Sequence, residues 1–143
     1  MALVQWMQED LTQMHRMLLE KAAERTYEQE QAEHCCEALW RHIYLEEETI
    51  FPALRKVATI AGTLNNFEGD HHLMRELIET IQQKKSDDLR GTLVRLHLVF
   101  SRHMDEEERW LLPLINQNFS PHQQEELVME ILRAEQQHPP SLA

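Results

Sequence analysis

Residues 42–52 read HIYLEEETIFP, and residues 103–113 repeat the pattern as HMDEEERWLLP. Both copies contain a His, three residues, Glu-Glu, three more residues, a bulky apolar residue and a Pro. On an α-helix, residues i and i+4 share one face, with Cβ atoms about 5–6 Å apart. Each copy therefore places one imidazole beside one carboxylate. Two such helices facing each other would offer both groups twice to one pocket, and this predicts a metal site.

The composition predicts one all-α domain over residues 1–143. Gly and Pro are few, with three and five residues, whereas helix-forming residues are abundant. The length suits a single domain with a real core. A net charge of −11 without a cluster of Lys and Arg argues against binding to nucleic acid or to an anionic membrane. There is no leader and no apolar run of about 20 residues, so we expect neither secretion nor membrane insertion.

The two cysteines, Cys35 and Cys36, are adjacent in the sequence and cannot easily form a disulfide with each other. They fit a reducing compartment, so we expect a cytoplasmic protein. The pair either binds a metal or fills a helix as small apolar residues, and the second interpretation is favoured because free cysteines are often buried.

Hydrophobic periodicity predicts an up-down-up-down four-helix bundle with a short extra C-terminal helix. A loop is expected over residues 57–66, and Phe51-Pro52 is expected to end or kink the second helix. The predicted helices run from Val4 to Glu24, from near Tyr27 to Pro52, from about Phe67 to Lys84, from the caps Ser86-Asp87-Asp88 to Leu114, and from Ser120-Pro121 to about Gln136. A capping box is predicted at Thr26 and Gln29, and another at Ser120 and Gln123.

Six polar side chains fall on the inward apolar stripes of the four long helices. They are His15, His42, Glu46, His71, His103 and Glu107. An ionised Glu in a dry core costs several kcal/mol unless it is compensated. His–Glu pairs could neutralise each other without a metal, but the duplicated spacing favours metal ligands.

Six ligands are too many for one tetrahedral zinc and suit two metals about 3.5–4 Å apart. Imidazole and carboxylate ligands without thiolate fit iron, manganese or zinc. The symmetric assignment gives two His to each metal, with Glu46 and Glu107 bridging. Two Fe(II) would bring four positive charges against two negative ones, so we expect a bridging hydroxide or oxide and open coordination positions.

The remaining polar and aromatic residues of interest lie off these stripes. We expect Glu47 and Glu48 to be solvated and His34, His122 and His138 to lie on the surface. Trp110 is expected near the pocket, either closing it or packing in the core. Trp6 and Trp40 are expected either to face a partner or a second copy, or to pack against the last helix.

On these motifs, from His15 to Pro113, the chain resembles the hemerythrin-like (HHE cation-binding) proteins. The resemblance implies a non-haem di-iron centre that binds O2, NO or related species. Oxygen carriers of that family have a second His one turn after the first on the third helix, where this chain has Arg75, and neither His72 nor His97 shares the ligand face. The resemblance therefore implies sensing or stress and iron handling instead of bulk O2 carriage. A cation at Arg75 would favour an anionic ligand such as peroxide or azide.

Three functions are compatible with these patterns. The first is a binder of O2, NO or reactive oxygen and nitrogen species. The second is a di-iron oxidoreductase acting on peroxide or NO. The third is a helical interaction module whose metal is structural. We expect a monomer or a weak homodimer, with room for a protein partner.

Overall fold

The computed structural model describes residues 2–23, 29–57, 61–85 and 87–137, and every regular element in these ranges is helical. In chain order the elements are α1 (Leu3–Ala23), α2 (Gln29–Leu45), the π-helical turn η1 (Glu46–Ile50), α3 (Phe51–Val57), α4 (Ala61–Gln82), α5 (Leu89–Glu106), the π-helical turn η2 (Glu107–Leu111), α6 (Leu112–Asn118) and α7 (Pro121–Gln137). The predicted all-α class is confirmed.

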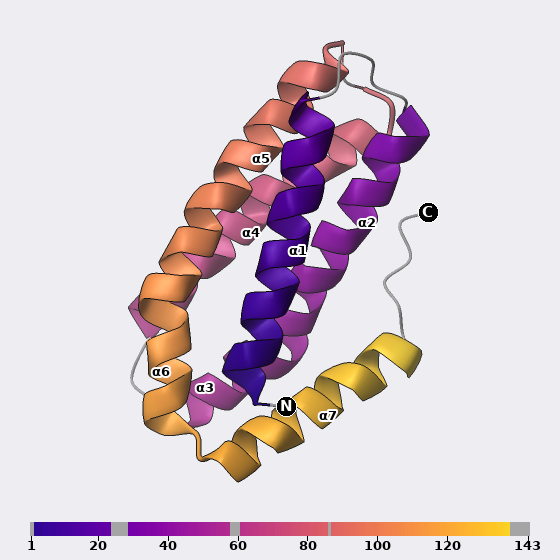
Figure 1. Cartoon of the computed structure of the whole chain (residues 1–143). Coiled ribbons are helices and arrows are strands. Elements are labelled where there is room, and N and C mark those ends of the chain that lie inside the picture. Colours follow the sequence, from indigo (N-terminus) through magenta and orange to yellow (C-terminus); the bar gives the residue numbers. More distant parts are fainter. Residues whose placement is uncertain (1, 24–28, 58–60, 86, 138–143) are drawn as a thin grey trace.

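Four long helices enclose a common interior. Figure 1 shows α1, α2, α4 and α5 side by side with their long axes nearly parallel, while α7 crosses the end at which α1 begins. Contacts join α1 to α2, α2 to α4, α4 to α5 and α5 back to α1, so the four helices form a closed ring. The last helix, α7, contacts α1, α2 and η1. Interior side chains at mid-height are therefore shielded on all sides.

The helices that carry the repeated motif continue through their prolines by way of the two π-helical turns. The N–H of Phe51 bonds to the carbonyl of Glu46, and that of Leu112 bonds to the carbonyl of Glu107, in each case five residues back. A proline follows directly in each copy and has no N–H to donate. The wider π turn accommodates this loss, and such turns are frequent at functional sites. Each motif Glu is thus the first residue of a widened turn.

The connection before α4 is shorter than predicted. We expected a loop over residues 57–66, but α4 begins at Ala61, and residues 58–60 lie outside the described part. The added turns bury Leu64 completely and contain the weak helix formers Gly62 and Asn65. Tertiary burial outweighs local propensity here, because most helix stability in proteins comes from packing of the apolar face.

Two predicted helix starts are confirmed by their cap contacts. The side chain of Asp88 accepts a hydrogen bond from the N–H of Gly91 (3.0 Å) at the start of α5. Before α7, the Ser120 N–H donates to the Gln123 side chain (2.8 Å) and the Gln123 N–H donates to the Ser120 hydroxyl (3.2 Å). These reciprocal bonds form the predicted capping box. The predicted caps at Thr26 and Ser86 lie outside the described residues.

A buried polar layer divides the apolar core into two clusters. On α4, Phe67 belongs to one cluster and Met74 to the other, with His71 between them. On α5 and η2, Phe100 and Leu111 are divided in the same way. Such a layer is costly unless its polar groups are paired or bound to a metal.

The cysteines and tryptophans pack in ways that only partly match the predictions. Cys35 and Cys36 are buried in the second apolar cluster. Burial, aided by Cys35 and nearby carboxylates, raises the pKa of Cys36 to about 12. This supports the interpretation of the pair as small apolar residues. Trp6 and Trp40 are partly buried against the two clusters, whereas Trp110 is 59% exposed, so its predicted place near the core is wrong.

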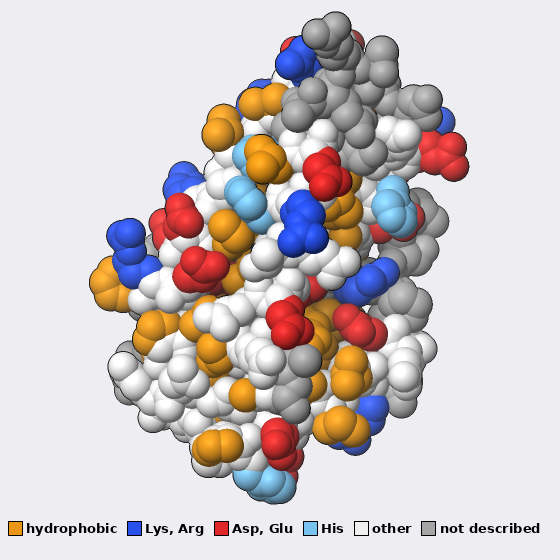
Figure 2. All heavy atoms as spheres, in the orientation of Figure 1, with side chains coloured by type: hydrophobic (Ala, Val, Ile, Leu, Met, Phe, Trp, Pro, Cys, Tyr) orange, Lys and Arg blue, Asp and Glu red, His pale blue; other side chains and the backbone are white. Residues whose placement is uncertain are grey.

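On the face shown in Figure 2, Lys and Arg side chains lie singly among acidic and apolar ones. No helix within the described ranges combines the length and the apolar character that a membrane span requires.

Candidate metal centre

Five buried side chains converge in the polar layer between the two halves of the core. They are His42, Glu46, His71, His103 and Glu107. Each offers one ligand-type atom, and these atoms all lie within 4.8 Å of one another. None of the five is more than 3% exposed. The structure thus brings together five of the six predicted ligands.

Each of the two carboxylates faces imidazoles from different helices. One oxygen of Glu46 lies against Nε2 of His42, and its other oxygen is 3.4 Å from Nε2 of His71. Oε1 of Glu107 is 2.5 Å from Nε2 of His103 and 3.3 Å from Nε2 of His42. The spacing of His and Glu by four residues produces the contacts within each motif, and the bundle produces the contacts between helices. Each carboxylate therefore lies between imidazoles of two helices.

Several buried polar atoms of this cluster have no hydrogen-bond partner. These are both oxygens of Glu46, Oε2 of Glu107 and Nδ1 of His71. The approach of Glu46 to His42 is close, but it lacks hydrogen-bond geometry. Unpaired buried polar groups are expensive, and a cation between them would satisfy the carboxylate oxygens. The donor set therefore fits a metal.

A second layer of carboxylates holds the outer nitrogens of two rings. Nδ1 of His42 is 3.0 Å from Oδ2 of Asp10, and Nδ1 of His103 is 3.3 Å from Oδ2 of Asp70. Arg102 donates to the other oxygen of Asp70 at 2.6 Å. A carboxylate that accepts the Nδ1 proton leaves the lone pair of Nε2 directed inward, which is the usual arrangement around a metal-binding His.

The third ring also has a carboxylate behind it. Oε2 of Glu47 lies 3.8 Å from Nδ1 of His71, which is too far for a hydrogen bond, and Glu47 pairs with Arg75. Burial tends to raise the pKa of Glu47, but His71 and Arg75 hold it below its usual value. The expectation that Glu47 is simply solvated is therefore wrong. Arg75 also lies over the ring of Trp40, 5.7 Å from its centroid, so Glu47 and Trp40 already engage its charge.

The carboxylates of the cluster raise the pKa of two of its imidazoles. Burial alone would lower the pKa of His42, but Glu46, Glu107 and Asp10 raise it well above its usual value. Burial would also lower the pKa of His103, but Glu107 and Asp70 raise it to about 10. For Glu46, burial works to raise the pKa, but His42 holds it well below the usual value. A metal ion must therefore displace protons from the imidazoles.

The sixth predicted ligand, His15, lies apart from this cluster. Its ring is 5.4 Å from that of His97, centroid to centroid, and its Nδ1 is buried without a hydrogen-bond partner. The position of α1 along the long axis of the bundle explains why His15 lies outside the cluster. Asp10 and Asp70 hold equivalent positions behind His42 and His103, and they are 60 residues apart.

The same offset of 60 residues compares α1 with α4 position by position. It pairs His71 with Leu11, which is fully buried, and it pairs Arg75 with His15. On α1, therefore, an apolar residue takes the position at which α4 supplies an imidazole.

The sequence interpretation did not identify Asp10 and Asp70. Each lies 32 or 33 residues before the His that it contacts. Asp70 directly precedes an inward His, and Asp10 directly precedes an inward Leu. An Asp directly before an inward residue occurs on both helices, and this repeat could have indicated the two outer carboxylates.

Residues 7–115 match the family model described as the Hemerythrin HHE cation binding domain. The matched residues include all five clustered side chains, His15 and both outer Asp residues. No curated protein and no solved structure matches the chain.

Proposed function

Because the chain belongs to the hemerythrin HHE cation-binding domain family, we propose that it is an up-down-up-down four-helix bundle that holds two metal ions in its interior. His42, His71 and His103 are the terminal ligands in this proposal. Glu46 and Glu107 bridge the ions, because each faces rings of two different helices. A nitrogen and oxygen donor set without thiolate is compatible with iron, and with manganese or zinc as substitutes.

The observation that carries the proposal is the state of Glu46. The residue is 1% exposed, and neither of its oxygens has a hydrogen-bond partner. A carboxylate kept ionised in an apolar interior requires compensation by positive charge. Two cations joined by Glu46 and Glu107 would provide that compensation, with a bridging oxide or hydroxide completing the charge balance.

The proposed function is binding of, or reaction with, O2, NO or reactive oxygen and nitrogen species. Three imidazoles and two carboxylates do not fill the coordination positions that two iron ions offer, so positions remain for small or anionic ligands. We propose sensing or stress and iron handling over bulk O2 carriage, because Arg75 stands where oxygen carriers of the family have a second His. Attraction of an anionic ligand by Arg75 is not part of this proposal, because Arg75 forms an ion pair with Glu47.

The test is metal analysis of the purified protein together with absorption spectra before and after addition of azide, O2 and NO. We expect two metal ions per chain and a ligand-sensitive spectrum of an oxo-bridged ferric centre. Both should be lost in Glu46→Ala and in His103→Ala. A wild-type protein that takes up no iron, manganese or zinc would refute the proposal. Consumption of peroxide or NO with a reductant would indicate an oxidoreductase.

A structural metal is the second candidate function, because the polar layer divides the core. Filling the centre would then mainly stabilise the fold. At a free metal concentration about 1,000 times Kd, the free energy of unfolding should rise by about 4 kcal/mol. A higher melting temperature without any azide- or NO-dependent spectrum would favour this candidate.

A further inference from the structure

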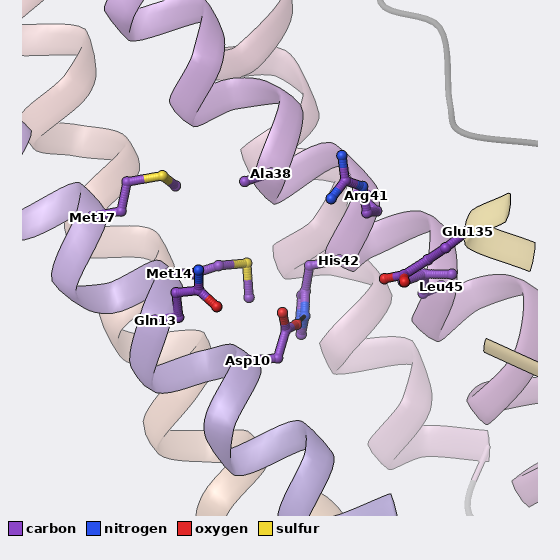
Figure 3. A pocket seen from close by; sticks show the side chains of 9 residues that line it. All are labelled: Asp10, Gln13, Met14, Met17, Ala38, Arg41, His42, Leu45 and Glu135. Carbon is purple, nitrogen blue, oxygen red and sulfur yellow. Dashed lines mark hydrogen bonds and ion pairs between the residues drawn. The ribbon is translucent and has the colours of Figure 1, made fainter. Parts of the chain in front are cut away.

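The metal centre needs a path from solvent, because its five side chains are at most 3% exposed. A cavity between α1, α2 and α7 reaches one of them, and Figure 3 shows it from close by. His42 lines this cavity together with Asp10 and Met14 of α1, Arg41 of α2 and Glu135 of α7. On the far side of the His42 ring, Nε2 lies against Glu46, whose oxygens have no hydrogen-bond partner. The cavity is thus separated from the centre by the imidazole ring of His42.

The cavity can accommodate a small hydrated ion. Its volume is about 110 Å³. A single water molecule needs roughly 10–15 Å³ of such space, so several water molecules fit together with an ion. A bulky organic substrate does not fit.

The charges around the cavity are arranged to attract a cation. Figure 3 shows Asp10 pointing from α1 to His42, while Glu135 reaches in from α7. Burial raises the pKa of Glu135; Asp10 adds to this effect, and Arg41 opposes it. Two carboxylates therefore share a partly desolvated space with the Arg41 guanidinium, and Asp10 also lies 3.0 Å from Nδ1 of His42. A divalent cation in this space would relieve their mutual repulsion.

The helix that supplies Glu135 lies beyond the matched family domain. The match ends at residue 115, whereas α7 runs from Pro121 to Gln137. This helix crosses the end of the bundle and contacts α1 and α2 (Figure 1). It therefore adds a charged wall to a cavity that α1 and α2 would otherwise leave more open.

We propose that this cavity is the uptake route for the divalent metal ion, with Asp10 and Glu135 as the carboxylates that draw the ion toward His42. Arg41 competes with the ion for Glu135 and so slows its uptake. Glu135 acts on the rate of loading and not on the final occupancy, because it does not touch the ligand atoms. The inference rests on the proposed metal centre.

The test measures how fast the metal-free protein takes up Co(II), followed by the absorption of the bound ion. Glu135→Gln should slow uptake roughly threefold to tenfold, because one attracting charge is lost. Arg41→Gln should accelerate it by a similar factor, and both variants should reach the wild-type stoichiometry. Added salt should slow the wild-type protein more than Glu135→Gln.

Glu125→Gln is the matched control, since it removes the same charge from an exposed position on α7 that does not line the cavity. It should load at the wild-type rate. Uptake rates unchanged in both Glu135→Gln and Arg41→Gln would overturn the inference while leaving the metal centre intact. A wild-type protein that never binds Co(II) would instead refute the proposed function.

Discussion

Replacing Asp70 with Asn should weaken metal binding without removing any proposed ligand. Asp70 lies 3.3 Å from Nδ1 of His103, its side chain is 10% exposed, and its pKa is lowered by His103 and Arg102 although burial opposes this. Loss of such an outer partner typically reduces metal affinity 10–100-fold, or roughly 1.4–2.7 kcal/mol. Asn keeps an oxygen that can accept from Nδ1, so the loss reports the missing charge. Asp10→Asn should have a smaller effect, because Asp10 is 29% exposed and water screens its charge.

Competition with a chromophoric chelator for Zn(II) measures both affinities. Asp105→Asn is the control, because it removes the same charge from an exposed position on α5. The double variant of Asp10 and Asp70 should show additive losses, since each residue acts through a different ring. An affinity of Asp70→Asn within twofold of wild type, or an equal loss in Asp105→Asn, would refute the assigned role.

Three further predictions follow from the centre and the core. The pKa of His42 is raised, and that of His103 is raised to about 10, so metal binding near pH 7 should release protons and metal affinity should rise with pH toward about 10. A pH indicator measures the proton release, and chelator competition measures the affinity. A metal affinity that does not change with pH would contradict this prediction. His71→Ala should lower the metal stoichiometry, whereas His15→Ala should leave it unchanged in metal analysis; equal losses would place His15 among the ligands. Cys36, fully buried with a pKa of about 12, should resist thiol reagents in the folded protein and react quickly only after unfolding.

The sequence predicted which residues of each helix face the interior better than it predicted how far each helix is shifted along the bundle axis. A spacing of four residues on one helix specifies two neighbouring side chains, so the pairs His42–Glu46 and His103–Glu107 followed from local geometry. The depth at which α1 lies in the bundle is a tertiary property. Leu11 and His15 lie on the same stripe one turn apart, and periodicity does not distinguish them. Contacts with α5, α2 and α7 set how far along the bundle α1 lies, and in that position Asp10 contacts His42 while His15 stays outside the cluster.

The π-helical turns were equally inaccessible to propensity arguments. Pro52 predicted an end or a kink of the second helix, because a proline removes one N–H and clashes with the preceding turn. In the bundle, α3 and α6 still bury Leu54 and Ile115, and this burial favours continuing the helix through a wider turn. The helix therefore does not end at the proline. It continues through a π-helical turn that begins at the proposed ligand Glu.

The two halves of the chain contribute unequally to the centre, although both carry the repeated motif. Among the described residues, the clustered imidazoles come from α4 and α5 in the second half of the chain and from α2 alone in the first half. Asp10 shows that α1 retains the outer carboxylate, while Leu11 replaces the inner ligand beside it. A metal ion near α1 would therefore have fewer protein ligands than one near α4 and α5. In the proposed two-ion centre, solvent or a small ligand would complete the coordination of that ion, so the two ions should differ in their spectra and exchange rates.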